Sequence, residues 1–259
     1  MTNRFIGSVK KALPVIFLLV FVSLFLFRET FTKGFVPVPA DTLVGSYFPW
    51  LDYKWGYQVG VPVKNPPISD VFSQFFVWKY QLIDIFKQGS WPLWNDHSFS
   101  GTPLLATYHS AAFFPANIFF LLPKFLGWSI YIASSTFIAA LGMYLFTRNW
   151  IKSKPARLVA AVIFSLAGPM TTWSEFGTGV WAAAMLPFIL FFVDEIILHK
   201  KNKLLPLISV LTACLLLAGH AQLDTYAAIL VPAYILFRLR STPRKDKISL
   251  FFWFAFFGI

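Results

Sequence analysis

The sequence predicts an all-α polytopic membrane protein, and it does so through its composition and the placement of its charges. Hydrophobic residues make up 57% of the 259-residue chain and charged residues 13%, whereas a soluble domain carries roughly 25% charged residues. Most of the 22 Lys and Arg residues form four clusters between apolar runs. These clusters are Arg4/Lys10/Lys11, Arg148/Lys152/Lys154/Arg157, Lys200/Lys201/Lys203 and Arg238/Arg240/Arg244/Lys245/Lys247. Because positive charge is retained on the cytosolic side, every second loop is expected in the cytosol.

This orientation accounts for the net charge of +11. It gives no sign of nucleic-acid binding, because a nucleic-acid binder gathers its basic residues on one soluble face. The expected partner is instead the lipid bilayer, with the N-terminus cytosolic and the first loop extracytoplasmic. The one cysteine, Cys214, lies inside an apolar run. It is read as a small buried hydrophobe, and one thiol permits no disulfide framework.

Six apolar runs are expected to cross the bilayer. The first begins at Ala12 and must extend to about Phe31, and it resembles an uncleaved signal anchor. The others are Phe125 to Phe146, Leu158 to Trp173, Val180 to Leu198, Leu204 to Gly219 and Thr225 to Phe237. A seventh begins near Ile248, and the residues up to Ile259 are too few to span. Residues 1–259 are therefore expected to be one transmembrane domain at the start of a longer protein.

The first outer loop, about residues 32–110, is expected to contain a helix from Ser69 to Gln88. Apolar residues recur in it at helical spacing, Ser69 can cap it, and Gly89 can end it. Such a helix would lie in the outer interface with its apolar face in the headgroup region. The alternative is a helix that packs on a small extracytoplasmic domain. Further on, the segment from Ala111 to Leu122 is short and broken by Pro115, which indicates a re-entrant or interfacial segment.

The common motifs of soluble enzymes are missing. The sequence has no Walker A loop, no GxGxxG, no H-E-x-x-H and no GxSxG, which argues against an ATPase, a dinucleotide enzyme, a common zinc protease and an α/β-hydrolase. Ionisable and polar residues instead gather at the outer ends of the predicted helices. They are Asp41, Asp70, His97, His109, Glu175, His220, Gln222 and Asp224.

Each of these residues also has a structural interpretation. Asp41 and Asp70 could charge or cap the first turn of a helix. Glu175 could be a solvated carboxylate, and His97 and His109 could be loop or interface residues. His220 and Asp224 stand at i and i+4, which suits a shared hydrogen bond as well as a metal ion. Taken together, two carboxylates in the first outer loop and more polar groups returning later suit a site at the outer edge of the membrane.

Several short motifs occur in a fixed order along the chain. They are Asp41-Thr-Leu, Phe48-Pro-Trp50, Pro66-Pro67-Ile-Ser-Asp70, Gly89-x-x-Pro92-Leu-Trp94-Asn95, Gly101-Thr-Pro103-Leu-Leu-Ala106, Pro115 and Gly219-His220-Ala-Gln222. This order resembles the start of the bacterial YfhO-like membrane protein family. The last motif departs from the family's Gly-His-Pro-Gln element, because alanine stands in place of proline.

The resemblance implies a GT-C-like transmembrane helix bundle with a large, partly helical first outer loop. Such glycosyltransferases move a sugar from a polyprenyl-phosphate carrier to an envelope glycan or polymer outside the bacterial cytoplasmic (inner) membrane. An acidic residue just past the first span commonly serves there as base or metal ligand, a place that Asp41 matches, with Asp70 as the second candidate. His97, His109, Glu175, His220, Gln222 and Asp224 are the expected substrate-binding residues. The metal requirement is left open, with a divalent cation as one way to offset the phosphate charge.

Two other functions are compatible with the sequence. A flippase or transporter for lipid-linked sugars would need ionisable groups at mid-membrane depth and broken helices along a path. A non-catalytic envelope protein would tolerate substitution of its carboxylates.

Overall fold

The computed structural model describes residues 2–240, 242, 243, 250 and 254, and this part of the chain is mostly helical. Its α-helices are α1 (Thr2–Leu26), α2 (Arg28–Lys33), α3 (Ala40–Ser46), α4 (Phe76–Lys87), α5 (Lys124–Phe146), α6 (Lys154–Ser165), α7 (Gly168–Thr172), α8 (Gly179–His199), α9 (Leu205–Leu217) and α10 (Ala221–Leu239). Shorter helical turns are Trp50–Gly56, Pro66–Ser69, Val71–Phe75, Tyr108–Ser110, Pro115–Leu121, Thr147–Asn149, Ser174–Phe176 and Asn202–Leu204. The strands β1 (Trp94–Asn95) and β2 (Thr102–Pro103) pair antiparallel. Apart from Leu250 and Phe254, the expected seventh segment lies outside the described residues.

Helices occupy all six positions at which a span was expected. Within the described residues, two helices are long and apolar enough to cross a membrane, namely Lys124–Asn149 and Gly179–His199. A third is gained if Lys154–Ser165 and Gly168–Phe176 form one bent span. The apolar parts of α1 and α9 are shorter, at Leu13–Leu26 and Asn202–Leu217. A membrane location is thus compatible with these helices, and the six-span topology stays a prediction.

The expected continuous span from Leu158 to Trp173 is broken in the structure. The segment Lys154–Ser165 ends before Gly168, and the axis turns by 47° between the two parts. Pro169 occupies the start of α7, where its missing N–H costs least. Ala167, just before α7, has extended backbone with φ −59° and ψ 150°, so the chain leaves the first helix after Ser165 and starts α7 in a new direction.

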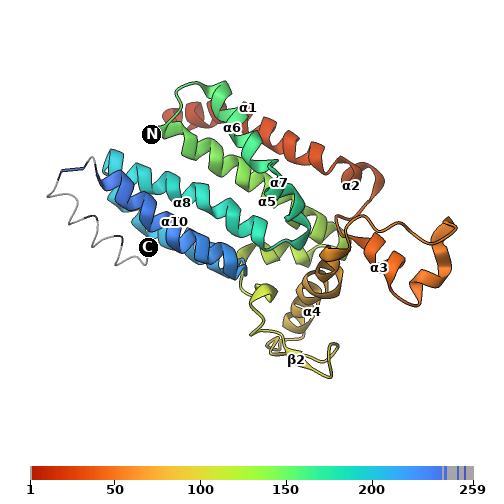
Figure 1. Ribbon diagram of the computed structural model, residues 1–259. Helices are drawn as coiled ribbons and strands as arrows, with labels where there is room; N and C mark the ends of the chain where they lie inside the picture. Colours follow the sequence, from red (N-terminus) through yellow and green to blue (C-terminus); the bar gives the residue numbers. More distant parts are fainter. Residues whose placement is uncertain (1, 241, 244–249, 251–253, 255–259) are drawn as a thin grey trace.

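Helix α8 lies at the centre of the bundle. It packs against α5, α9 and α10, and in Figure 1 it runs between α5 and α10. Trp128, Tyr131 and Ile132 of α5 and Val193 and Ile196 of α8 are inaccessible to solvent. The main apolar core therefore forms along the α5–α8 contact, and the other helices surround it.

Large apolar side chains cover the outer surface of the helices. On α1 these include Phe17, which is 74% exposed, and on α10 Ile229, which is 67% exposed. Others in this class are Leu13, Phe21, Phe25, Val159, Ile163, Val210, Leu216, Leu230, Leu236 and Phe237. Exposed apolar surface of this extent marks a binding surface for lipid or protein, and a bilayer around the helices would cover it.

The helix expected at 69–88 forms, but as three consecutive segments. A 3₁₀ turn at Pro66–Ser69 leads into a π-helical turn at Val71–Phe75 and then into α4. Ser69 does not cap it, since no side-chain cap bond forms at its start. Val71, Phe75 and Leu82 are buried in the main core, so the apolar face of this helix packs on the helix bundle itself.

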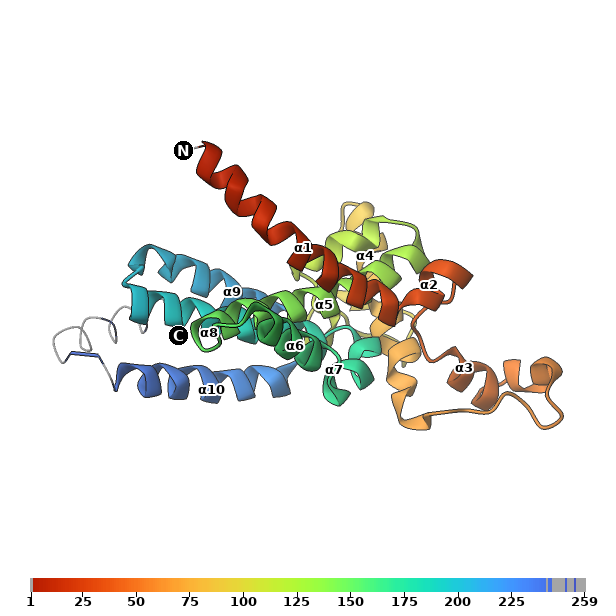
Figure 2. The ribbon, with the colours of Figure 1, turned by 90° about the horizontal axis from the view of Figure 1, so that it is seen from above.

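The two ends of the bundle differ in character. Figures 1 and 2 show α3, α4 and β2 gathered beyond one end of the long helices, which we call the loop end. Arg148, Lys200 and Arg238 lie at the opposite end, which we call the basic end. The segment 111–122 belongs to the loop end, where Asn117 and Phe120 of the turn Pro115–Leu121 are buried.

Candidate functional site

Buried polar atoms that lack a hydrogen bond are concentrated at the loop end. Within the described part of the chain, six such atoms lie in α3, in the segment 175–181 or at the start of α10. They are Thr42 Oγ1, Glu175 Oε2, Thr178 Oγ1, Trp181 Nε1, His220 Nδ1 and Asp224 Oδ1. Since nearly all buried polar groups in proteins are paired, such a group of atoms indicates a place for a polar ligand or water.

The first carboxylate of this region, Asp41, is held by the backbone of a neighbouring segment. Its Oδ2 accepts a hydrogen bond of 2.9 Å from the N–H of Lys64. Asp41 lies in the first turn of α3, where it charges the turn, but no side-chain cap bond forms there. Glu175 lies close enough for the charges of Asp41 and Lys64 to act on it.

Two histidines meet across the gap between the first loop and the turn from α9 to α10. The rings of His109 and His220 lie 5.7 Å apart at 76°, and Nδ1 of His109 bonds to the carbonyl of Gly219 at 2.8 Å. The His220 ring rests on Gly179, where an added Cβ would come within 2.9 Å of it. Burial lowers the pKa of His220, and the neighbouring His109 lowers it further, so neutral imidazole is favoured.

The side chain of Asp224 pairs with Tyr108 and not with the ring of His220, so the i,i+4 spacing of Asp224 and His220 gives only the backbone hydrogen bond from Asp224 N–H to the His220 carbonyl, at 3.1 Å. Tyr108 Oη lies 2.5 Å from Asp224 Oδ2 and 2.7 Å from the carbonyl oxygen of Leu216. One phenol hydrogen cannot serve both acceptors. Burial raises the pKa of the Asp224 carboxyl, whereas the hydrogen bond that Tyr108 donates to it lowers that pKa.

Aromatic side chains connect these groups. Phe75 contacts the ring of His109 at 5.1 Å and that of Phe176 at 5.5 Å. Trp173 continues the row, at 5.0 Å from Phe176 and 6.0 Å from His220. We call the polar residues around this row the loop-end site: Asp41, Tyr108, His109, Glu175, His220 and Asp224.

Three of the expected residues lie apart from the contacts of this site. Asp70 is exposed and accepts a hydrogen bond of 3.3 Å from Gln74 of its own helix. His97 is exposed in the turn between β1 and β2, where its N–H bonds to Asn95. Gln222 is next to the site along the chain and donates to Tyr226 at 2.6 Å.

A metal site is not evident. Among the residues that the structure describes, no three His, Cys, Asp or Glu side chains lie close enough together to hold a metal ion. The metal requirement, which the sequence left open, gains no candidate ligand cluster from these residues.

A buried lysine beside the site was missed by the sequence analysis. Lys79 of α4 is 1% exposed, and its Nζ donates to Asn117 Oδ1 at 2.9 Å and contacts the ring of Tyr131 at 5.6 Å. Burial lowers the pKa of Lys79 to about 7. It was missed because a lysine is rarely buried without a charged partner, although Phe75 and Leu82 stand at i−4 and i+3 on the same helical face.

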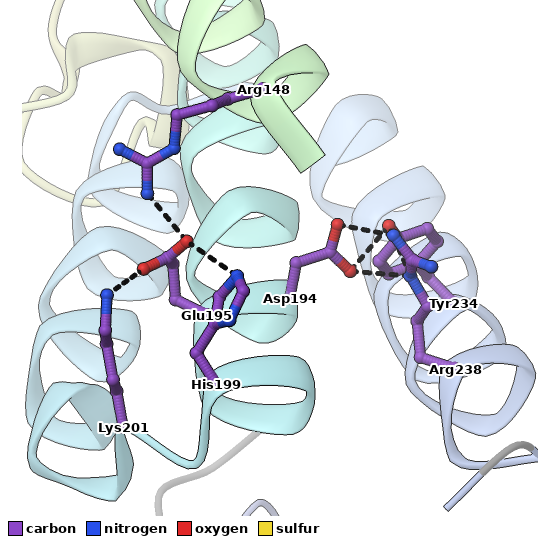
Figure 3. A network of polar contacts seen from close by, with 7 residues as sticks. All are labelled: Arg148, Asp194, Glu195, His199, Lys201, Tyr234 and Arg238. Atoms are coloured by element: carbon purple, nitrogen blue, oxygen red, sulfur yellow. Dashed lines mark hydrogen bonds and ion pairs between the residues drawn. The ribbon is translucent and has the colours of Figure 1, made fainter. Parts of the chain in front are cut away.

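The basic end holds a second polar group, shown in Figure 3. Asp194 and Glu195 of α8 are 0% and 2% exposed, although they stand one to two turns before the basic cluster Lys200/Lys201/Lys203. Arg238 and Tyr234 bind Asp194, while Glu195 binds one residue of its own helix and two residues outside that helix. These partners are Arg148 at 2.7 Å, Lys201 at 2.5 Å and His199 at 3.7 Å. The network joins α5, α8 and α10, which points to a structural role.

A scan of protein-family models found no match to this chain, and searches of curated proteins and of solved structures found no similar protein. The fold and the two polar groups therefore stand on the residues and contacts described above.

Proposed function

We propose that this protein is a membrane glycosyltransferase of the GT-C type that moves a sugar from a polyprenyl-phosphate carrier to an acceptor in the bacterial envelope. The observation that carries the proposal is the loop-end site itself. Carboxylates, imidazoles and unpaired buried polar atoms lie together at the end of helices whose outer surface is apolar. A substrate with a hydrocarbon tail and a polar head matches that combination.

In the proposed reaction, a carboxylate accepts the proton of the acceptor hydroxyl while that oxygen attacks the anomeric carbon. The carbon–phosphate oxygen bond breaks on the opposite side, so the configuration inverts and the lipid phosphate leaves. Asp41 is the first candidate for the base, because one of its oxygens is fixed by Lys64 N–H and the other is left for substrate. Glu175, with its unpaired Oε2, is the second.

The leaving phosphate needs stabilisation of its charge. His220 favours the neutral form, so it would serve as a hydrogen-bond partner and not as a cation. Lys64 is exposed and acts electrostatically on Glu175, which makes its ammonium group the candidate counter-charge at this site.

The test is transfer of radiolabelled sugar from a polyprenyl-phosphate donor by the purified full-length protein. Asp41→Asn should lower the rate about 10²-fold or more, because the base is lost while size is kept. Glu175→Gln tests the second candidate, and Asp52→Asn, in the exposed turn Trp50–Gly56, is the control with an unchanged rate. Unchanged transfer in both single variants and in the double variant would reject the assignment.

A further inference from the structure

A pocket of about 220 Å³ opens beside His220, between three helices. One wall is Pro169, Met170 and Trp173, from α7 and the residue after it, and the opposite wall is Leu223 and Tyr226 of α10. The floor is α8, through Gly179, Val180 and Ala183. The volume exceeds the roughly 150 Å³ of an apolar cavity that binds benzene, so a branched hydrocarbon unit fits.

The pocket exists because of features already described. The 47° turn before Gly168 carries α7 away from the line of α6, and Figure 1 shows α8 between the green α6–α7 segment and the blue α10. Small residues on α8 leave space at the floor of the pocket. At Gly179 an added Cβ would come within 2.9 Å of the His220 ring. Trp173 and Tyr226 are 45% and 52% exposed, so the pocket is open to the side of the bundle.

The chemistry of the lining changes from one end to the other. His220 and Gln222 form its polar edge, next to the loop-end site, while the other lining residues are mainly apolar. The exposed Ile229 and Leu230 continue the apolar surface along α10 away from the site. No lysine or arginine is among the described residues that line the pocket, so it fits an uncharged part of a ligand.

We propose that this pocket is the lateral entrance for the isoprenoid chain of the donor, which holds the isoprene units nearest the phosphate. The inference rests on the proposed function and assigns its lipid substrate a place between α7 and α10. A chain lying along α10 enters with its polar head at His220, next to the unpaired atoms of the site. A branched chain fills the volume between Met170 and Leu223, which a straight acyl chain fills less well.

The experiment is photolabelling of the full-length protein in nanodiscs with farnesyl phosphate that carries a diazirine in the isoprene unit next to the phosphate. Mass spectrometry of peptides should place the label on residues 169–173 and 223–226. Ala183→Trp fills the floor and should reduce labelling at least tenfold, whereas Ala213→Trp, on the exposed face of α9, should leave it unchanged. Thermal unfolding of each variant identifies a folding defect.

Competition tests the occupant without any variant. Unlabelled farnesyl phosphate should suppress labelling of the pocket, and dioleoyl phosphatidylglycerol at the same concentration should not. Equal suppression by both would make the pocket an ordinary lipid site and overturn the proposal, as would label confined to other helices. If sugar is transferred but the pocket is not labelled, this inference is wrong and the proposed function stands. If the pocket is labelled but no sugar is transferred, the glycosyltransferase assignment is wrong and the lipid-binding pocket stands.

Discussion

Arg238 binds Asp194 through two parallel hydrogen bonds, Nε to Oδ1 and Nη2 to Oδ2, each 2.6 Å long. This fork-to-fork geometry joins α10 to α8, and Asp194 is fully buried. Because paired charges of this kind are costly to separate inside a protein, the contact fixes how the two helices lie against each other.

Asp194→Asn should therefore destabilise the protein by about 3–5 kcal/mol, since it leaves the largely buried guanidinium of Arg238 without its counter-charge. Thermal unfolding in detergent measures the effect. Asp84→Asn is the matched control: Asp84 and Lys124 are 3.7 Å apart and largely exposed, and such pairs contribute about 0–1 kcal/mol. Equal losses in both variants would refute the structural role of the Arg238–Asp194 pair.

Lys79→Met should raise the stability of the protein at pH 7. The pKa of Lys79 falls from 10.5 to about 7 through burial, so between these values the unfolded chain binds the proton and the folded protein does not. Stability therefore rises with pH in this window, by up to about 1.4 kcal/mol per pH unit. The variant removes this dependence, which pH-resolved unfolding would reveal.

The comparison variant for this prediction is Lys87→Met, because Lys87 is exposed at the end of the same helix. It should leave both the stability at pH 7 and the slope with pH as they are in the unmodified protein. A slope that persists in Lys79→Met would mean that another group titrates, and the buried lysine would lose its role in the pH dependence.

Gly219→Ala should cost more than Gly34→Ala, although both glycines have positive φ, of 77° and 72°. An alanine held in the left-handed backbone region lowers the free energy of unfolding by about 1–2 kcal/mol at either position. At Gly219 the added Cβ would also lie 2.5 Å from the carbonyl oxygen of Tyr108, whereas nothing lies within 4 Å at Gly34. Overpacking adds about 1–3 kcal/mol. Similar unfolding midpoints for the two variants would argue against a close contact at Gly219.

The predicted orientation is testable with single cysteines in a Cys214→Ser background. Ser73 and Ser153 are both exposed, and the basic clusters predict that they lie on opposite sides of the membrane. An impermeant thiol reagent applied to intact cells should label position 73 and spare position 153. Labelling of position 153 would reverse or abolish the predicted topology.

The positions of the helices followed from the sequence because apolar runs and their periodicity are local properties. Contacts between residues that are far apart in the sequence could not be predicted in this way. Asp194 and Glu195 stand near the basic cluster that begins at Lys200, and their burial depends on Arg238 and Arg148, which come from distant parts of the chain. The bend before Gly168 is a local property too, because Pro169 inside this apolar run is a signal for a kink.

The candidate site shows the same division. Asp41, His109, Glu175, His220 and Asp224 were singled out as polar residues at helix ends, and the structure brings them to one end of the bundle. Tyr108 was missed, because its role depends on the position of Asp224, which lies 116 residues away. Asp70 and His97 share the same polar pattern, but their contacts lie within their own segments.

The bond between His109 and the carbonyl of Gly219 spans 110 residues of sequence, which gives the site an order of assembly. A ribosome that adds about 5–20 residues per second makes the second partner roughly 5–20 seconds after the first. Until then Tyr108 and His109 lack the turn between α9 and α10 that they bind. The start of α10 completes the site, so the first loop must stay available while the five α-helices from α5 to α9 are made.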